Sequence, residues 1–224
     1  MPDAIGFDVY GTLVDPHAMR AQLEAVAGDR AGQMAQLWRE KQIQYSFRRA
    51  LMQKYENFDV CTQQALTFAA NSLKLNLRDD DRAKLIEAYR RLPAFPDVVP
   101  AIRSLKQAGF KLAAFSNGVE ASLRALLGHS GILPHLDAVI SVDDLKTYKP
   151  DPRVYRHLAK RLGSSLENTW LASSNAWDVI GAKAVGLRAA WIKRNPEEFI
   201  DPWGIAPDLM TSTLLDFCSK LQSG

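Results

Sequence analysis

The sequence predicts an α/β fold in which a parallel sheet is covered by helices on both faces and carries an all-helical insertion. After residue 92, short apolar runs alternate with segments of helical periodicity, the pattern of a sheet covered on both faces. One similar apolar run stands alone near the N-terminus. Residues 15–92, which separate this run from the alternating segment, show little strand signal. We therefore expect a core built from residues 1–14 and 93–224, with a helical cap built from residues 15–92.

The first predicted strand, Ile5 to Val9, leads directly into a carboxylate and a tight turn. Asp8 lies near its carboxyl end, and Gly11 gives the following turn backbone freedom and lets a ligand approach closely. Open α/β sheets bind their ligands at the carboxyl ends of the strands, so this position suits a functional carboxylate. Aspartate also commonly begins a turn, and this stretch alone leaves both interpretations open.

The insertion carries apolar residues at helical spacing in four segments. Three acids, Asp79 to Asp81, mark the start of the fourth, because carboxylates are favourable at the positive end of a helix dipole. An insertion at this point of the chain would lie over the carboxyl ends of the strands, as a lid on a site there. The four predicted helices are 17–27, 32–55, 59–73 and 79–92.

Beyond the insertion, Pro93, Pro96 and Pro100 mark a linker and the start of a helix, and strands and helices then alternate. The predicted strands are 111–115, 138–141, 169–172 and 189–192, with one more short element beginning at Leu209. The predicted helices are 100–108, 120–128, 152–162, 177–184 and 214–221.

Polar clusters follow four of the predicted strands, and in a parallel sheet these ends meet in one crevice. Lys149 precedes a proline and therefore lies in an extended or turn segment. A cation near Asp8 would keep that carboxylate ionised, as a carboxylate nucleophile requires. The four clusters are Asp8 with Thr12, Ser116 with Asn117, Lys149, and Ser173, Ser174 and Asn175 with Asp178.

Composition excludes several classes of protein. The net charge is only +3, and no basic run with interleaved aromatic residues predicts nucleic-acid binding, although a small anionic substrate suits the chain. Cys61 and Cys218 have neither a disulfide nor a metal-ligand spacing. With no signal peptide or membrane-spanning run in the sequence, we expect a cytoplasmic protein with no membrane partner.

These motifs together resemble the haloacid dehalogenase (HAD) superfamily over essentially the whole chain. The resemblance rests on Asp8 to Leu13, Ser116 to Gly118, Lys149-Pro150 and Ser173 to Asp178. It implies a Rossmann-like parallel core with a helical cap inserted after the first strand, which is the layout predicted above.

Two departures indicate the branch of the superfamily. Most members are magnesium-dependent phosphatases whose first motif has a second aspartate as general acid, and here Tyr10 stands in its place. The first member of their acidic pair in the last motif is also replaced, which leaves Asp178. The chain therefore resembles the L-2-haloacid dehalogenases, which implies a hydrolase of carbon–halide bonds with no metal and no other cofactor.

Three other functions remain as alternatives. A phosphatase is disfavoured by Tyr10, and a non-catalytic binding protein is disfavoured by the intact nucleophile and lysine. A hydrolase that opens a strained ring, such as an azetidine carboxylate, would use the same Asp8, and the sequence hardly separates it from a dehalogenase.

The resemblance implies that Asp8 attacks C2 of a short L-2-haloalkanoic acid, inverts it and forms an aspartyl ester, which water hydrolyses to a D-2-hydroxy acid. Asp178, oriented by Ser173 and Asn175, is expected to position or deprotonate that water. Thr12, Lys149 and Ser173 are either catalytic or orienting. The implied catalytic residues are Asp8, Thr12, Arg39, Lys149, Tyr155, Ser173, Asn175 and Asp178.

Substrate contacts and assembly follow from the same resemblance. The substrate carboxylate is expected on Ser116 and the backbone N–H groups of Tyr10 to Thr12, and the halide on Arg39 and Asn117. An apolar wall would exclude bulk water, and a homodimer is expected. The implied substrate-binding residues are Tyr10, Gly11, Arg39, Phe58, Ser116, Asn117 and Trp177.

Overall fold

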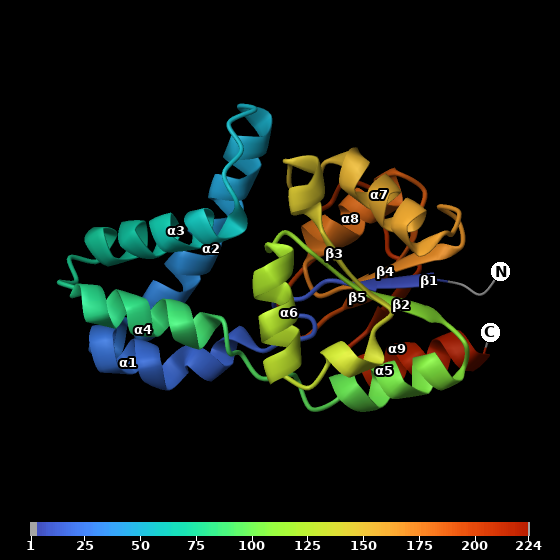
Figure 1. The fold of residues 1–224 in the computed structure, drawn as a ribbon, viewed down its shortest axis with the longest axis horizontal. Coiled ribbons are helices and arrows are strands. Elements are labelled where there is room, and N and C mark those ends of the chain that lie inside the picture. The colour runs from blue at the N-terminus through green and yellow to red at the C-terminus, as the bar shows by residue number, and fades with distance from the viewer. Residues whose placement is uncertain (1–3, 224) are drawn as a thin grey trace.

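The computed structural model describes residues 4–223, so residues 1–3 and 224 of the predicted core lie outside the described part. A parallel sheet packed among helices forms the core of the fold (Figure 1). Its six strands run in the order β3-β2-β1-β4-β5-β6, and every pairing is parallel. The predicted α/β fold is confirmed. The strands are β1 (Ala4–Phe7), β2 (Lys111–Ser116), β3 (Ala138–Ser141), β4 (Thr169–Ser173), β5 (Arg188–Ile192) and β6 (Leu209–Thr211).

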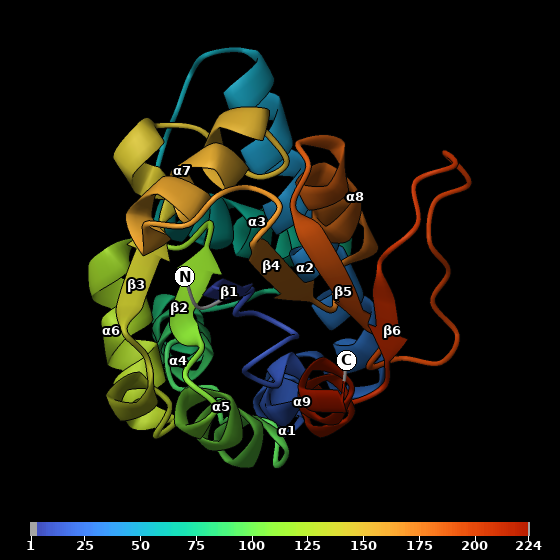
Figure 2. The ribbon, with the colours of Figure 1, turned by 90° about the vertical axis from the view of Figure 1, so that its right-hand side faces the viewer.

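Helices cover both faces of the sheet, as the alternating pattern predicts. Two of them, α7 and α8, pack on one face, while α5 and α9 pack together on the other (Figure 2). The buried strands therefore read as nearly continuous apolar runs. The core helices are α5 (Val98–Gln107), α6 (Glu120–His129), α7 (Pro152–Leu162), α8 (Ala176–Ala184) and α9 (Leu214–Ser223), with 3₁₀ turns at Leu133–His135 and Val142–Leu145.

The helical cap lies between β1 and β2 in the chain and to one side of the sheet (Figure 1). The predicted helix 17–27 begins as a 3₁₀ turn, and the predicted helix 32–55 ends early at Leu51, because Gln53 adopts a positive φ of 56°. The cap comprises 3₁₀ turns at Pro16–Met19 and Gly28–Arg30, with α1 (Arg20–Ala27), α2 (Ala31–Leu51), α3 (Phe58–Ser72) and α4 (Asp79–Tyr89).

The two connections between cap and core run side by side. The backbone N–H of Asp15 donates to the carbonyl of Pro93 at 2.9 Å, and that of Phe95 donates to Leu13 at 3.1 Å. An isolated antiparallel bridge joins Val14 to Ala94 between them. The chain therefore leaves the core and returns to it at one place, close to Asp8.

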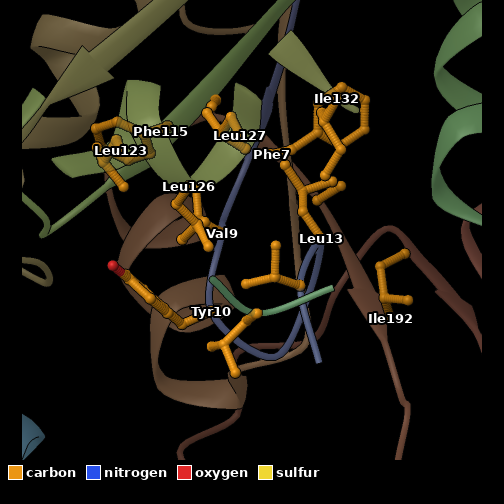
Figure 3. Close-up of a cluster of buried hydrophobic side chains, with 14 of the residues drawn as sticks. Phe7, Val9, Tyr10, Leu13, Phe115, Leu123, Leu126, Leu127, Ile132 and Ile192 are labelled. Atoms are coloured by element: carbon orange, nitrogen blue, oxygen red, sulfur yellow. The ribbon is translucent and has the colours of Figure 1, made fainter. Parts of the chain in front are cut away.

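An apolar cluster supports the first strand and the turn that follows it. Phe7, Val9 and Leu13 are fully buried, and Figure 3 shows them beside the leucines of α6, with Tyr10 at the edge of the cluster. Each such buried side chain contributes about 1.5–3 kcal/mol of hydrophobic stabilisation. The position of Asp8 is therefore fixed by the packing on both sides of it.

Cys61 and Cys218 are both free and buried, as expected. Between residues 4 and 223, no helix combines the length and the apolar character needed to cross a bilayer.

Candidate active site

Three neighbouring strands deliver the polar residues to one edge of the sheet. Asp8 follows β1, whose last residue, Phe7, pairs with Ala114 of β2 on one side and Ala172 of β4 on the other. Ser116 ends β2 and Ser173 ends β4. Because the strands are parallel and in register, the polar ends that sequence predicts to converge do meet here.

The ammonium group of Lys149 lies at the centre of the site. Its Nζ donates to Oδ1 of Asp8 at 3.1 Å, Oδ2 of Asp178 at 2.9 Å and the Phe115 carbonyl at 2.9 Å. Three acceptors match the three protons of the group, and the side chain is 1% exposed. Burial by itself would lower the pKa of Lys149, but the charges of Asp178 and Asp8 outweigh it and raise that pKa. The lysine is therefore a fixed cation.

The two oxygens of Asp8 have different surroundings. Oδ2 accepts from the Thr12 hydroxyl at 3.0 Å and from Nδ2 of Asn175 at 2.8 Å. Oδ1 accepts only from Lys149 among the described residues. Because Oδ1 keeps more of its lone-pair capacity, it is the oxygen better placed to attack a substrate.

Ser174 holds Thr12, and sequence reasoning assigned it no role. Its backbone N–H donates to Oγ1 of Thr12 at 2.8 Å, and its own hydroxyl lies 3.1 Å from the same atom. The backbone donor occupies an acceptor site of Thr12 and so directs the threonine proton towards Asp8. Ser174 belongs to a turn-forming cluster, and nothing in its spacing distinguishes it from its neighbours.

Asp178 is held by residues other than those expected. Oδ2 accepts from Lys149, Oδ1 accepts from the Tyr155 hydroxyl at 2.8 Å, and the residue is fully buried. The expectation that Ser173 and Asn175 orient this carboxylate is wrong for their side chains. The Ser173 hydroxyl accepts from the Asn175 backbone N–H at 3.1 Å, and the Asn175 amide donates to Asp8.

Burial and the charge of Asp8 raise the pKa of Asp178, although Lys149 acts against them. Burial also raises the pKa of Tyr155, which keeps its phenol protonated as a donor to Asp178. Tyr155 therefore touches the carboxylate and serves to position it.

The residues expected to bind substrate offer donors of two kinds. Oδ1 of Asn117 accepts from the Lys149 backbone N–H at 3.0 Å, which orients the amide and leaves its NH₂ group as a donor. The buried Ser116 hydroxyl accepts from the Gly118 N–H at 3.2 Å and can still donate its proton.

Two backbone amides expected at the substrate carboxylate serve the turn instead. The Gly11 N–H donates to the Val14 carbonyl at 2.9 Å, and the Thr12 N–H donates to the Val9 carbonyl at 3.3 Å. Gly11 has a φ of 83°, so its role is to close this turn. Of the three amides, that of Tyr10 remains as the candidate donor.

The cap contributes Arg39, which the sequence alone would place on a solvated helix face. Arg39 is half-buried, and its Nη2 donates to Oδ1 of Asn175 at 3.4 Å. This contact joins α2 of the cap to the residue that also holds Asp8. The prediction that Arg39 lies at the site therefore agrees with its position.

Aromatic rings close the cap side of the site. The ring centroids of Tyr10 and Phe58 lie 6.0 Å apart, as expected for an apolar wall. The third expected member, Trp177, contacts Phe47 of α2 edge-on at 5.2 Å. Tyr89 of α4 stacks on Tyr10 with centroids 5.0 Å apart, and sequence reasoning missed it because nothing marks it within an amphipathic helix.

Both carboxylates of the site bind the same ammonium group. Asp8 and Asp178 both bind Lys149, and in the described part of the chain no three His, Cys, Asp or Glu side chains form a group that could hold a metal ion. The arrangement offers a buried nucleophilic carboxylate, several neutral donors and a second carboxylate.

Known proteins share this arrangement of the chain. A family model for haloacid dehalogenase-like hydrolases matches residues 2–186. An (S)-2-haloacid dehalogenase from Pseudomonas sp. (strain YL) is 39% identical over 94% of this chain and 90% of its own. The (S)-2-haloacid dehalogenase 4A of Burkholderia cepacia is 40% identical over 86% of this chain and 84% of its own.

A solved structure agrees over the whole fold. The L-2-haloacid dehalogenase of Xanthobacter autotrophicus, with chloropropionic acid covalently bound, is 31% identical and covers 99% of each chain with a TM-score of 0.92. The similarity therefore includes the core and the helical cap together. From its sequence and its fold, the chain belongs to the haloacid dehalogenase-like hydrolases.

Proposed function

We propose that this chain is an (S)-2-haloacid dehalogenase, which hydrolyses short L-2-haloalkanoic acids to D-2-hydroxy acids. The observation that carries the proposal is the residue two positions after the nucleophile. It is Tyr10, whose buried ring packs against Phe58. Phosphatases of the superfamily need a carboxylic acid at that position to protonate a leaving oxygen, whereas a halide leaves without a proton. The names of the relatives support the same substrate class.

In the first step, Oδ1 of Asp8 attacks C2 from the side opposite the halogen. A C–O bond forms while the carbon–halogen bond breaks, and the halide leaves with the electron pair and inverts C2. The NH₂ group of Asn117 and the guanidinium of Arg39 stabilise the anion as it develops. Such stabilisation is strong in a site that excludes water.

The substrate carboxylate is bound by neutral donors on the opposite side of the nucleophile. The Ser116 hydroxyl and the Tyr10 N–H are the two groups proposed to hold it. Tyr10, Phe58 and Trp177 cover the hydrocarbon part of a small substrate.

In the second step, water attacks the carbonyl carbon of the Asp8 ester, so the configuration at C2 does not change again. Asp178 takes the proton of the water, and its raised pKa suits a base. The Oδ2 atom becomes the oxyanion, and Asn175 and Thr12 already donate to it. Collapse of the intermediate releases the hydroxy acid, whose oxygen takes the proton from Asp178. Asp8 is left as a carboxylic acid with the second proton of the water, and it loses that proton to solvent to become a carboxylate again.

The boundaries and the environment of the enzyme are part of the proposal. Residues 15–92 act as the cap domain over a core of residues 1–14 and 93–224, and the adjoining connections at Val14 and Ala94 support this division. The enzyme is proposed to work as a cytoplasmic homodimer.

The test compares two reactions in parallel. Halide release is measured from each enantiomer of 2-chloropropionate with EDTA present, and phosphate release is measured from p-nitrophenyl phosphate with magnesium. Halide from the L-enantiomer alone, unaffected by EDTA, is the expected result. Phosphate release without halide would contradict the proposal, and inactivity in both assays would direct attention to strained-ring amino acids.

A further inference from the structure

Tyr89, the last residue of α4, buries a hydroxyl group without a hydrogen-bond partner. The residue is 7% exposed, and within residues 4–223 its oxygen is one of three buried side-chain atoms that lack a partner. The other two, on Trp170 and Arg194, are nitrogens. Burying an unpaired hydroxyl opposes folding, so a phenol here needs a reason that phenylalanine would not satisfy.

The position of Tyr89 connects it to the active site. Its ring stacks on Tyr10 at an interplanar angle of 13°, and Trp38 lies on it at 5.5 Å between centroids. Burial raises the pKa of Tyr89, Arg39 acts against this, and Asp8 raises it further. The charged groups that influence this hydroxyl are thus those of the site, and the phenol stays protonated as a donor.

Arg39 beside it also has donors in reserve. Its one hydrogen bond in the described structure is the 3.4 Å contact with Asn175, although a guanidinium carries five N–H donors. An anion bound between Arg39 and Tyr89 would satisfy both side chains.

Gln42 and Arg39 lie close enough to the Tyr89 hydroxyl to lower its pKa, but neither side chain meets hydrogen-bond geometry with it. Nε2 of Gln42 donates to the Thr62 hydroxyl at 3.0 Å, and Nε1 of Trp38 donates to the Thr62 carbonyl at 2.9 Å. These two bonds lock α2 to α3 and fix the rings around Tyr89. The phenol is consequently rigid, and an anion that meets it gains a hydrogen bond with little loss of side-chain entropy.

We propose that the Tyr89 hydroxyl donates a hydrogen bond to the departing halide, together with Arg39. The inference rests on the proposed dehalogenase function and adds a catalytic residue to it. No proton is transferred, because the halide leaves as an anion and the phenol only stabilises its growing charge. Chloride is the poorer leaving group and depends on this donor more than bromide does.

The experiment uses Tyr89→Phe, which removes only the oxygen, and Tyr45→Phe as the control. Tyr45 lies on α2, where its ring meets Phe68 at 6.3 Å, and it belongs to no part of the proposed machinery. The ratio kcat/KM is measured for L-2-chloropropionate and L-2-bromopropionate, because it includes the step that breaks the carbon–halogen bond. Inhibition by added chloride and the Tm are measured for each protein.

For Tyr89→Phe we expect about a tenfold loss of kcat/KM with the chloro substrate, the size of one hydrogen bond to a charged group. The loss with the bromo substrate is smaller, and chloride inhibits more weakly. The Tm stays equal or rises, because the deleted hydroxyl makes no bond within the protein. Tyr45→Phe leaves all four quantities at the wild-type values.

Two results would overturn the inference while the proposed function stands. The first is a Tyr89→Phe enzyme as active as the wild type, and the second is an equal loss with both halogens, which a carboxylate contact or a packing defect would produce. Failure of the wild type to release any halide would overturn the proposed function itself and this inference with it.

Discussion

The Nζ atom of Lys149 lies 3.1 Å from Oδ1 of Asp8, and both side chains are almost completely withdrawn from solvent. The same ammonium lies 2.9 Å from Oδ2 of Asp178, so one cation serves two buried carboxylates. Buried charges are tolerated only when they are paired and hydrogen-bonded, and this triad meets that requirement. The nucleophile, its counter-ion and the second carboxylate therefore form one electrostatic unit.

Replacing the shared cation should destabilise the protein as well as inactivate it. Lys149→Met leaves Asp8 and Asp178 facing each other in a buried site, and we expect a loss of about 3–5 kcal/mol in the free energy of unfolding at neutral pH. Urea unfolding followed by circular dichroism measures this loss. Lys220→Met is the control, since Lys220 is exposed and its Nζ makes one bond of 3.2 Å to a carbonyl.

The pH dependence of that loss follows from the same charges. The pKa of Lys149 is raised in the folded protein, so its ionised form stabilises the fold. This stabilisation is fully present below the pKa of an unfolded lysine and is lost only as the pH rises through the pKa of Lys149 in the folded protein. The variant should recover part of its deficit on acidification, because Asp178 takes up a proton and the repulsion disappears. A deficit that is constant from pH 5 to pH 8 would contradict the triad.

The acid side of the activity profile should report Asp178. Because burial and Asp8 raise its pKa, Asp178 loses its capacity as a base at a higher pH than an ordinary aspartate would. We expect kcat to fall on acidification with a midpoint above the usual aspartate range, and Lys149 to add no alkaline limb below its own raised pKa. Steady-state kinetics over a range of pH measures this midpoint, at pH values where the protein is shown to stay folded. A kcat that does not change down to pH 4 would exclude Asp178 as the base.

Asn175 should matter chiefly for hydrolysis of the ester. Asn175→Ala removes the 2.8 Å bond to Oδ2 of Asp8, which is the proposed oxyanion position, and we expect a loss of about 100-fold to 1,000-fold in kcat. The aspartyl ester should then accumulate, and intact-protein mass spectrometry detects it. Asn71→Ala, on an exposed position of α3, is the control, and absence of the ester adduct would show that this donor acts in another step.

Gly181 should prove intolerant of a methyl group because of what it touches. A Cβ there would lie 2.4 Å from the Tyr155 hydroxyl oxygen and 2.8 Å from Cβ of Pro150. We expect Gly181→Ala to destabilise the fold by about 1–3 kcal/mol and to lower kcat, because Tyr155 is pushed away from Asp178.

Thermal unfolding compares that variant with Gly32→Ala, whose Cβ would meet nothing within 4 Å on a helical position. The control should be neutral or slightly stabilising, because alanine favours a helix. Adding Tyr155→Phe to Gly181→Ala removes the atom of closest contact and should restore part of the Tm. If the double variant is less stable than both single variants, Tyr155 is not the group displaced.

The fold was predictable because its signals are local. Apolar runs and helical periodicity predicted the strand Ala138–Ser141 and the helix Pro152–Leu162 with their observed bounds. Boundaries in the cap were less accurate, since the end of α2 depends on the positive φ of Gln53, which composition does not mark.

The site was predictable where residues follow strands and harder where partners come from tertiary contacts. Asp8, Ser116 and Ser173 lie at strand ends. Two other contacts depend on packing between distant elements: Tyr155 of α7 meets Asp178, and a ring of α4 stacks on Tyr10. A pattern within a helix shows that a face is buried and does not show which residue that face meets. For the same reason the side chains that hold Asp178 were misassigned.

In the proposed mechanism, Asp8 forms an ester with C2 of the substrate and water then attacks the carbonyl carbon of Asp8. A single turnover in H₂¹⁸O, with enzyme in excess over L-2-chloropropionate, tests it by mass spectrometry of the lactate and of the peptide that contains Asp8. We predict unlabelled lactate with ¹⁸O in the Asp8 carboxylate. Labelled lactate with an unlabelled Asp8 would show that water attacks C2 directly and that no ester forms on Asp8.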